Sequence, residues 1–323
     1  MTKIQDVAKA AGVSVSTVSR AFRDDTVVNE NTRKLVLAKA REMGYYPNLL
    51  ARGLKSRKSK MVGFLGSIET PFYVNIIQAV ERELQKNGYQ LLVGTSVHDI
   101  EKERDYLETL AGSCVSGIIM TPFLEERDRG ISDLAKRGIP VIQLFRNPYD
   151  DLDSVLMDDE KGAYLATKAL LEKGHSRILL FDIPVSCAPE RADGYRRAFR
   201  EMGKPVDDNL IVITSNEDIP AVIERFQPTG IVTGVYEQGK CVFQYAKAKG
   251  LHIPDAFSVV MFDDSEWMQI VDIDAIAQPV EYIGSSASRL LLERMNGERK
   301  EPVSLLLQPK YISRGSVKAL NRM

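Results

Sequence analysis

The sequence predicts an α/β protein with a small helical head and a larger body built on two doubly wound parallel sheets. Three observations support this prediction. The first sixty residues contain helical apolar patterns only, whereas the remainder alternates short β-like runs with amphipathic stretches. A chain of 323 residues also exceeds what one hydrophobic core usually serves. We therefore expect two or three folding units.

The head is predicted to be a helix-turn-helix unit. Apolar residues at i, i+3, i+4 and i+7 from Ile4 mark a first helix, and Gly12 can adopt the left-handed conformation that ends it. Ser14 is placed to cap a second helix, and Asn29 a third that ends at Gly44. Two helices joined by a glycine-containing turn, with a third in support, form the helix-turn-helix arrangement.

In that arrangement the second helix enters the major groove with its N-terminus first. Arg20 can donate two hydrogen bonds to guanine O6 and N7, and Val15 can contact a thymine methyl group. Hydroxyl and amide side chains suit phosphate oxygens. The predicted DNA contacts on these helices are Ser14, Val15, Ser16, Thr17, Arg20 and Asn29. Any three-helix bundle has polar outward residues, so periodicity alone leaves DNA binding undecided.

Charge is divided unevenly along the chain. Residues 1–60 contain 13 Lys and Arg against 5 Asp and Glu, whereas the whole chain contains 43 against 44. A basic head on an acidic body is what a nucleic-acid contact confined to one end requires. A solvated charged face would give the same numbers, so charge does not exclude that alternative.

The body is predicted to alternate strands with helices. The strand candidates are residues 61–66, 89–94, 117–121, 140–145, 177–182, 210–214, 229–233 and 257–262. The amphipathic segments include residues 74–87, 101–111, 162–173 and 192–202. This alternation is typical of parallel sheets with right-handed crossovers. Eight strands divide into two halves of four near residues 157–161.

Residues that follow these strands are the candidate ligand site, because ligands in open α/β sheets bind beyond the carboxyl ends of strands. Aromatic faces, arginines and scattered carboxylates suit a hydroxylated small molecule. The predicted contacts are Phe72, Tyr73, Arg146, Asp158, Arg191, Tyr236 and Asp263. The sequence has no G-x-G-x-x-G after the first strand, no P-loop and no G-x-S-x-G. We therefore expect a sensor rather than an enzyme.

No cofactor, metal or membrane is expected. The three cysteines have no C-x-x-C spacing, and the three histidines lack the paired spacings of zinc sites. The longest apolar runs are far too short to cross a bilayer. Lys3, Asp6 and Lys9 stand where a signal peptide would have its apolar stretch. We expect a cytoplasmic protein with reduced thiols.

Four motifs resemble those of one family. D-V-A-K-A-A-G-V-S-V-S-T-V-S-R runs from Asp6 to Arg20, and G-Y-Y-P-N-L-L-A-R-G-L ends at Leu54. In the body, R-A-D-G-Y begins at Arg191, and S-V-V-M-F-D-D includes Asp263. These motifs resemble the head and body signatures of the lactose-repressor (LacI/GalR) family, and the resemblance continues through the whole chain. It implies a two-lobed, periplasmic-binding-protein-like body.

The resemblance also implies the domain organisation. The DNA-binding domain would span residues 1–47, a hinge helix and linker 48–60, and the effector-binding and dimerisation domain 61–323. One lobe would hold about 61–158 plus 282–306, and the other about 159–281 plus 307–323. In this family the leucine matched by Leu54 wedges into the central base step of the operator, beside Lys55, and kinks the DNA. So short a basic segment is not a stable helix alone, so its folding should be coupled to binding; a flexible linker is the alternative.

The function implied is that of a homodimeric transcriptional repressor of carbohydrate or sugar-acid metabolism. It would bind a pseudo-palindromic operator and respond to a sugar, sugar acid or sugar phosphate. Two departures put the ligand in doubt: Val235-Tyr236 replaces the family's N-D, and residues 272–276 replace P-x-L-T-T-[IV]. Trp267, just after Asp263-Asp264, gives the chain a faint resemblance to regulators of the 2-keto-3-deoxygluconate type. A periplasmic-type sugar-binding protein with a helical head, and an α/β enzyme with a DNA-binding head, are the competing hypotheses.

Overall fold

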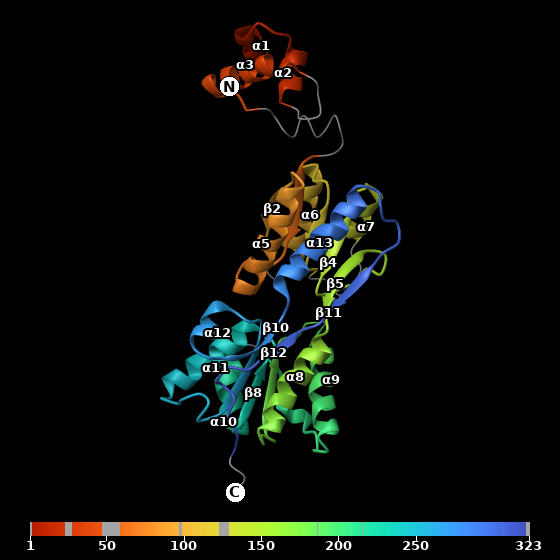
Figure 1. Cartoon of the computed structure of the whole chain (residues 1–323). Coiled ribbons are helices and arrows are strands. Elements are labelled where there is room, and N and C mark those ends of the chain that lie inside the picture. The colour runs from red at the N-terminus through yellow and green to blue at the C-terminus, as the bar shows by residue number, and fades with distance from the viewer. Residues whose placement is uncertain are drawn as a thin grey trace. The chain divides into compact units, whose positions relative to one another are not determined.

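The structure is a computed structural model that describes residues 2–22, 28–46, 59–96, 99–122, 129–185, 187–214 and 216–320. The chain forms two compact units, Met1–Ser59 and Lys60–Met323, whose elements are labelled in Figure 1. None of the described helices is long and apolar enough to span a membrane.

The first unit is a bundle of three helices: α1 (Ile4–Ala11), α2 (Val15–Ala21) and α3 (Glu30–Glu42). Its core is small, with Val7, Val18 and Val36 fully buried. Both predicted N-caps are confirmed. The Ser14 hydroxyl accepts a hydrogen bond from the Thr17 amide at 3.1 Å, and the Asn29 side chain accepts one from the Asn31 amide at 3.0 Å.

The second unit contains two six-stranded sheets. The first has the order β11 (Ser304–Leu307), β5 (Asp153–Met157), β4 (Val141–Leu144), β3 (Ile118–Met120), β1 (Met61–Leu65), β2 (Gln90–Gly94), and its pairs are all parallel. The second has the order β12 (Lys310–Ile312), β10 (Asp274–Ala277), β9 (Ser258–Phe262), β8 (Gly230–Thr233), β6 (Ile178–Asp182), β7 (Ile211–Ile213). Only its β12 pairs antiparallel.

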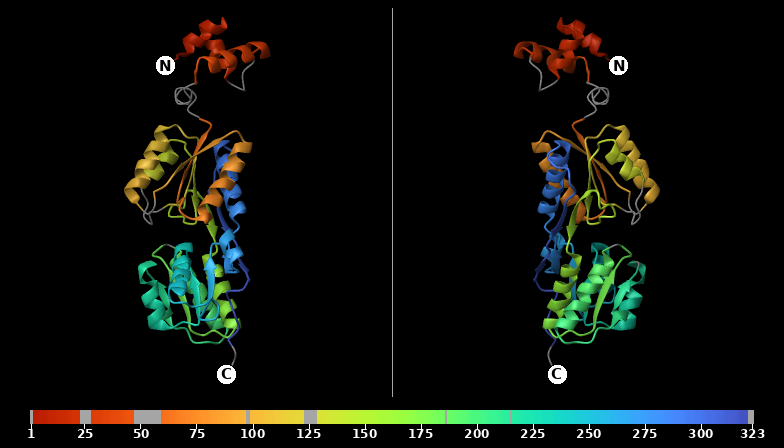
Figure 2. Two further views of the ribbon diagram at one scale, coloured as in Figure 1. Left: turned by 90° about the vertical axis from the view of Figure 1, so that its left-hand side faces the viewer. Right: turned by 90° about the vertical axis from the view of Figure 1, so that its right-hand side faces the viewer.

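Helices lie on both faces of each sheet (Figure 2). The first sheet packs with α5 (Pro71–Lys86), α6 (Ile100–Gly112), α7 (Arg129–Lys136) and α13 (Val280–Met295), and we call this assembly the N-lobe. The second packs with α8 (Asp159–Glu172), α9 (Ala188–Glu201), α10 (Ile219–Phe226), α11 (Tyr236–Ala248) and α12 (Glu266–Ile270), and we call it the C-lobe. The 3₁₀ turns Asp208–Leu210 and Asn216–Asp218 complete the C-lobe.

The predicted division into two halves of four strands is wrong, because each sheet has six. All eight predicted strands are present, but β5, β10, β11 and β12 are additional. β5 and β10 each begin with a fully buried aspartate, Asp153 and Asp274, which interrupts the apolar pattern of a strand. β11 and β12 have four and three residues with mixed exposure, too short for periodicity to indicate.

The chain passes between the lobes three times: from β5 to α8, from β10 to α13, and from β11 to β12. Two of these crossovers are tied together. The Asp158 carboxylate accepts hydrogen bonds from the Lys161 amide at 2.9 Å and from Gln308 Nε2 at 3.0 Å. Lys161 Nζ donates to Gln308 Oε1 at 2.6 Å. We call these three residues the crossover clamp.

Helices α8 and α9 pack with their backbones in close contact at Gly194. A Cβ atom placed on Gly194 would lie 1.9 Å from the carbonyl oxygen of Glu160, far inside van der Waals contact. Only glycine therefore permits this approach. The close contact matters for the site, because Arg191 lies one turn before Gly194 on α9, and Asp159 begins α8.

Candidate functional site

The outward face of α2 carries hydroxyl groups around one exposed apolar side chain. Val15 is 41% exposed, while Val18 and Ala21 on the same helix are buried. The Ser14 hydroxyl lies 2.7 Å from that of Ser16 and 2.9 Å from that of Thr17. The structure therefore presents Ser14, Val15, Ser16 and Thr17 together at the start of α2.

Two further predicted groups on the head's helices, Arg20 and Asn29, are also exposed. Leu54 and Lys55 lie outside the described residues.

Arg191 is the centre of a buried ion cluster in the C-lobe. Its Nε donates to Asp159 Oδ1 at 2.7 Å, and its Nη1 donates to Asp182 Oδ1 at 3.1 Å. The same Nη1 donates to the carbonyl oxygen of Gly234 at 2.7 Å. Arg191 is 7% exposed, Asp159 5% and Asp182 0%. The guanidinium therefore joins the start of α8 to the carboxyl ends of β6 and β8.

The charged groups of this cluster shift one another's pKa values. Burial raises the pKa of Asp182, and the Arg191 guanidinium opposes that rise. Burial alone would lower the pKa of Arg191, but the carboxylates of Asp159 and Asp182 raise it well above its usual range. Arg191 is thus held as a cation already matched by two carboxylates.

Asp263 follows β9 beside this cluster, in the left-handed backbone region with φ of 66°. Its Oδ1 accepts a hydrogen bond from Gln278 Nε2 at 2.5 Å, and Gln278 follows β10 in a crossover. Burial raises the pKa of Asp263 to about 7, although Arg191 and Gln278 both lower it. The site therefore has a carboxyl group that titrates near neutrality.

An aromatic cluster lies at the carboxyl ends of the N-lobe strands. The ring centroids of Phe72, Tyr73 and Phe145 are 5.4 to 5.8 Å apart. Arg146 follows Phe145, and its Nη1 donates to the carbonyl oxygen of Pro122 at 3.1 Å. The cluster offers apolar ring faces next to a guanidinium.

The carboxyl ends of the two sheets face each other. Burial raises the pKa of the Tyr73 hydroxyl, Arg146 in the same lobe lowers it, and Asp263 in the C-lobe raises it. Burial also raises the pKa of Cys187 to about 11, and both Arg191 and Arg146 oppose this. Charges from each lobe thus act on groups of the other. We call the facing groups the interlobe site: Phe72, Tyr73, Phe145, Arg146, Asp159, Asp182, Cys187, Arg191, Asp263 and Gln278.

Several buried polar atoms at the carboxyl ends of C-lobe strands have no hydrogen-bond partner within the part of the chain that the structure describes. They include Thr233 Oγ1 at the end of β8, Ser265 Oγ after β9 and Gln278 Oε1 after β10. A buried polar atom without a partner costs about 1–3 kcal/mol. Hydroxyl and amide groups left unpaired at one edge of a sheet are typical of a site that hydrogen-bonds a ligand.

The remaining predicted ligand contacts lie in different surroundings. Asp158 belongs to the crossover clamp, where its carboxylate is already engaged. Tyr236 begins α11 and packs edge-on against Trp267, with ring centroids 6.1 Å apart, and Trp267 packs in turn on Phe243. Among the described residues, no cluster of His, Cys, Asp and Glu has the arrangement of a metal site.

Sequence reasoning missed several groups of the interlobe site. Asp182 ends a predicted strand and Phe145 ends another, so the rule that selected their neighbours could have found them. Asp159 follows β5 and Gln278 follows β10, two strands that the apolar pattern did not indicate. Gln278 had no signal in the sequence, whereas Asp159 directly follows the predicted contact Asp158.

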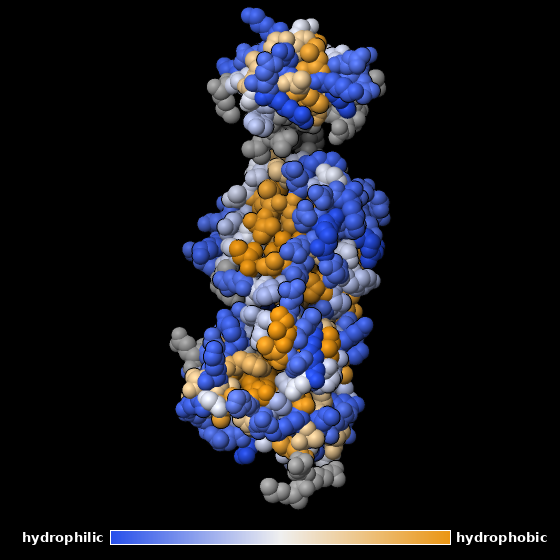
Figure 3. All heavy atoms as spheres, turned by 60° about the vertical axis from the view of Figure 1, so that its left-hand side comes forward, coloured by the Kyte–Doolittle hydropathy of each residue, from blue (hydrophilic) through white to orange (hydrophobic). Residues whose placement is uncertain are grey.

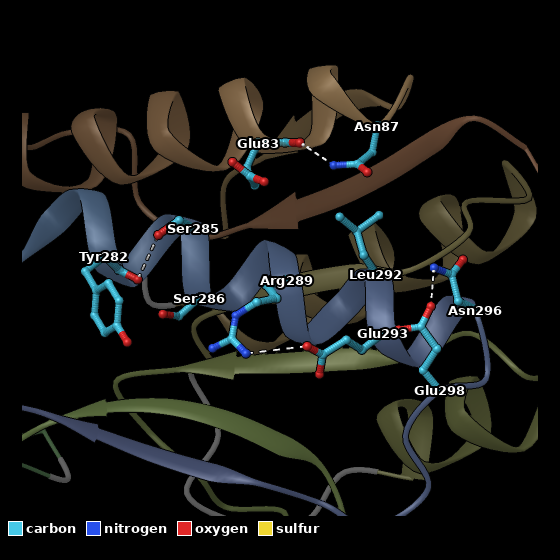
Figure 4. Close-up of a pocket in the computed structure, with 10 residues that line it drawn as sticks. All are labelled: Glu83, Asn87, Tyr282, Ser285, Ser286, Arg289, Leu292, Glu293, Asn296 and Glu298. Atoms are coloured by element: carbon cyan, nitrogen blue, oxygen red, sulfur yellow. Dashed lines mark hydrogen bonds and ion pairs between the residues drawn. The ribbon is translucent and has the colours of Figure 1, made fainter.

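A separate groove of about 560 Å³ lies between α5 and α13, away from the predicted residues (Figure 4). Most of its charged side chains form ion pairs. Arg289 lies 3.4 Å from Glu293, and Glu83 lies 2.8 Å from Lys86. The groove contains none of the predicted ligand contacts.

Replacing Asp263 by asparagine is expected to stabilise the protein above pH 7. Because its pKa is raised from 3.8 to about 7, the folded state binds the proton more tightly than the unfolded state. The free energy of unfolding therefore falls as the pH rises from about 4 to 7, and asparagine removes this loss. Its side-chain oxygen can still accept from Gln278. We expect a melting temperature higher by ~2–6 °C at pH 8, a difference that shrinks towards pH 4.

Thermal denaturation across this pH range tests the prediction. Asp255→Asn is the control, because Lys318 lowers the pKa of that exposed carboxylate, so its removal should give no gain. An Asp263→Asn protein whose melting temperature at pH 8 is equal to or below that of the wild type would contradict the raised pKa of Asp263.

Comparison with known proteins agrees with this geometry. Residues 3–48 match the model of bacterial regulatory proteins of the lacI family, and residues 58–315 match that of periplasmic binding proteins and sugar binding domain of LacI family. The chain is 30% identical to HTH-type transcriptional regulator DegA of Bacillus subtilis, over 99% of both chains. It is 31% identical to HTH-type transcriptional repressor PurR of Vibrio atlanticus, over 99% of this chain and 100% of that one.

A solved complex of transcriptional regulator CelR with cellobiose is also similar. It has a TM-score of 0.71 and 27% identity, and the match covers 98% of this chain and 100% of that one. These relatives are regulators of transcription rather than enzymes, as the sequence led us to expect. The family models span both the helix-turn-helix head and the two-lobed body. The chain belongs to the LacI family of bacterial transcriptional regulators.

Proposed function

We propose that this regulator is a homodimeric repressor of carbohydrate-related genes, acting in the cytoplasm on the nucleoid. It binds a pseudo-palindromic operator and changes its operator affinity when a polyhydroxylated effector binds at the interlobe site. The observation that carries this proposal is the set of unpaired polar atoms at the carboxyl ends of the C-lobe strands, opposite an aromatic cluster of the N-lobe. The cellobiose bound to CelR supports an effector rich in hydroxyl groups.

Exposed apolar side chains support a second copy of the chain as partner. Leu92 and Val93 on the edge strand β2 are 37% and 47% exposed, and Ile270 and Val271 at α12 are 80% and 53% exposed. Figure 3 shows apolar residues gathered on a face of the second unit, Lys60–Met323. Exposed apolar patches commonly mark protein interfaces. A two-fold dimer would also supply one head for each half of a palindromic site.

The coupling between effector and operator runs through the lobes in this proposal. A ligand that bridges the interlobe site would change how the lobes are held at their three crossovers, and so how the dimer presents its two heads. Leu54 and Lys55, outside the described residues, would contact the minor groove between the half-sites. The coupling free energy expected for such a system is about 1–3 kcal/mol.

The proposal can be tested with the full chain. An operator is first selected from random duplexes, and effectors are identified by thermal shift. Trp267, the single tryptophan of the sequence, packs on Tyr236 and provides a fluorescence signal for binding. Operator affinity is then measured by fluorescence anisotropy with and without the ligand. The proposal requires a change of about 5- to 150-fold; a ligand that binds without changing operator affinity would refute it.

Val15 is expected to read a thymine methyl group in each half-site. Replacing that thymine by deoxyuridine removes one apolar contact, worth about 0.8 kcal/mol, from each half-site. Together the two replacements should weaken binding roughly 15-fold. A Val15→Ala protein is the matched control, because it has already lost the contact and should respond much less to deoxyuridine. Equal losses for both proteins would show that Val15 does not contact the methyl group.

A further inference from the structure

We propose that the interlobe site selects against anions, so that the effector is a polyhydroxylated compound without a phosphate or carboxylate group. The inference rests on the proposed function, because it specifies the ligand class of the same site. It narrows the sequence-based expectation, which included sugar acids and sugar phosphates.

The first argument is that the principal cation of the site is already matched. Recognition of a phosphate or carboxylate usually depends on guanidinium donors that point at the anion in pairs. In Arg191, Nε is bonded to Asp159 and Nη1 to Asp182. The two carboxylates are almost completely buried. An anionic ligand would have to compete with two fixed carboxylates for one guanidinium.

The second argument is the balance of charge. The charged groups that act on one another across the site include two arginines, Arg146 and Arg191, and three aspartates, Asp159, Asp182 and Asp263. Further carboxylates stand close by. Burial and then the neighbouring Asp159 raise the pKa of Glu190. Burial raises the pKa of Glu237, and Glu69 of the other lobe adds to the rise, although Lys240 opposes it. Carboxyl groups therefore outnumber guanidinium groups around an anion that enters the site.

The third argument concerns helix N-termini, whose positive ends often bind anions. Helices α8, α9 and α11 all begin at the carboxyl edge of the C-lobe sheet. Each already has acidic residues in its first turn: Asp159 and Glu160, Glu190, and Glu237. These carboxylates offset the helix dipoles. The N-lobe helix α5 has no acidic residue there, and it contributes the aromatic rings of Phe72 and Tyr73.

The remaining polar and aromatic groups of the site suit the hydroxyl groups of a ligand. Thr233 Oγ1, Ser265 Oγ and Gln278 Oε1 are buried without a partner in the described part of the chain, and each can accept a hydrogen bond from a ligand hydroxyl. The Asp263 carboxyl can accept further ones. The rings of Phe72, Tyr73 and Phe145 offer apolar surface to the carbon face of a sugar ring. None of these groups requires charge on the ligand.

Matched ligand series test the selection on the full-length protein. For skeletons such as glucose, galactose, ribose and cellobiose, the neutral sugar and its amino derivative are compared with its sugar acid and its phosphate. Thermal shift and Trp267 fluorescence give the dissociation constants. We expect the compound that binds to be uncharged or amine-bearing, and at least tenfold tighter than its acid or phosphate.

The outcomes separate this inference from the proposed function. An acid or phosphate that binds more tightly than the neutral member of its series overturns the charge selection, while the effector-controlled repressor stands. Failure of every compound in all series to bind counts against both. A neutral ligand that binds but leaves operator affinity unchanged supports the selection and contradicts only the proposed function.

A variant tests the physical cause. Asp159→Asn removes one of the two carboxylates matched to Arg191 and keeps the shape of the side chain. We expect the affinity for the acid and phosphate members to rise at least tenfold relative to the neutral member. Asp193→Asn is the control, because it removes one negative charge from the exposed face of α9, where Asp193 pairs with Arg196. Equal behaviour of the two variants overturns the role of Asp159; the wild-type series remains decisive if Asp159→Asn does not fold.

Discussion

Replacing Arg191 by alanine is expected to lower the free energy of unfolding of the body by about 3–5 kcal/mol and to abolish the effector response. The cost arises because Asp159 and Asp182 would remain buried without the guanidinium that neutralises them, as would the carbonyl oxygen of Gly234. Removing one partner of a buried ion pair is far more destabilising than removing one of an exposed pair. Arg191 therefore shapes the site before any ligand arrives.

Urea denaturation and ligand titration by Trp267 fluorescence measure the two effects of Arg191→Ala. Arg196→Ala is the matched control on the same helix, because Arg196 pairs with Asp193 and Asp208 at the surface. Its loss should be within about 1 kcal/mol. The assignment fails if the two variants have equal stability, or if the Arg191→Ala protein retains wild-type ligand affinity.

Gly194→Ala should destabilise the C-lobe by about 3 kcal/mol or more, at the upper end of the range for overpacked positions. The added methyl group would lie 1.9 Å from the carbonyl oxygen of Glu160 and 2.9 Å from the amide nitrogen of Tyr164. Both atoms belong to the backbone of α8, so no side chain can turn aside to make room. Helix α9 must shift, and Arg191 moves with it away from Asp159.

Chemical denaturation and effector titration again provide the readout for Gly194→Ala. Gly112→Ala is the control, because nothing lies within 4 Å of a Cβ at that position, at the end of α6. Gly112→Ala should leave the free energy of unfolding unchanged or raise it slightly. If Gly194→Ala matches this control in stability and ligand affinity, close contact between α8 and α9 does not position the ion cluster.

The predictable part of the fold consists of elements with a strong local pattern. The eight strands found from the sequence have continuous apolar runs, and the caps Ser14 and Asn29 have a local chemical signature. β5 could not be found in the same way. Its first residue, Asp153, is buried because Arg294 of α13 forms an ion pair with it, and that partner is far away in the sequence.

A similar explanation accounts for the departure at residues 272–276 from the family's usual motif. Asp274 is 1% exposed on β10, where a charge would ordinarily be costly. Its carboxylate accepts hydrogen bonds from the amides of Arg314 and Ser316 and from the Tyr311 hydroxyl. The donors come from β12 and the segment that follows it. The sequence shows the departure from the family motif, but only the structure shows the hydrogen bonds that stabilise the buried Asp274 carboxylate.

For the site, the rule that ligands bind beyond strand ends selected Tyr73, Arg146, Arg191 and Asp263, which the structure brings to one place. The rule did not reveal that Nε and Nη1 of Arg191 are already engaged by other residues of the chain. It also could not distinguish Asp158, whose carboxylate holds a crossover. Both distinctions depend on contacts with residues distant in the sequence. They cannot be predicted from the sequence without the fold.

The three crossovers have a consequence for the order in which the protein matures during synthesis. The N-lobe starts first, at β1, yet its core includes Ile283, Leu290 and Leu291 of α13. Its sheet is completed by β11, which is among the last strands translated. From α8 to β10, by contrast, the C-lobe is one continuous stretch. A ribosome-bound chain can therefore assemble most of the C-lobe before the N-lobe receives α13 and its last strand, although β12 of the C-lobe is translated later still.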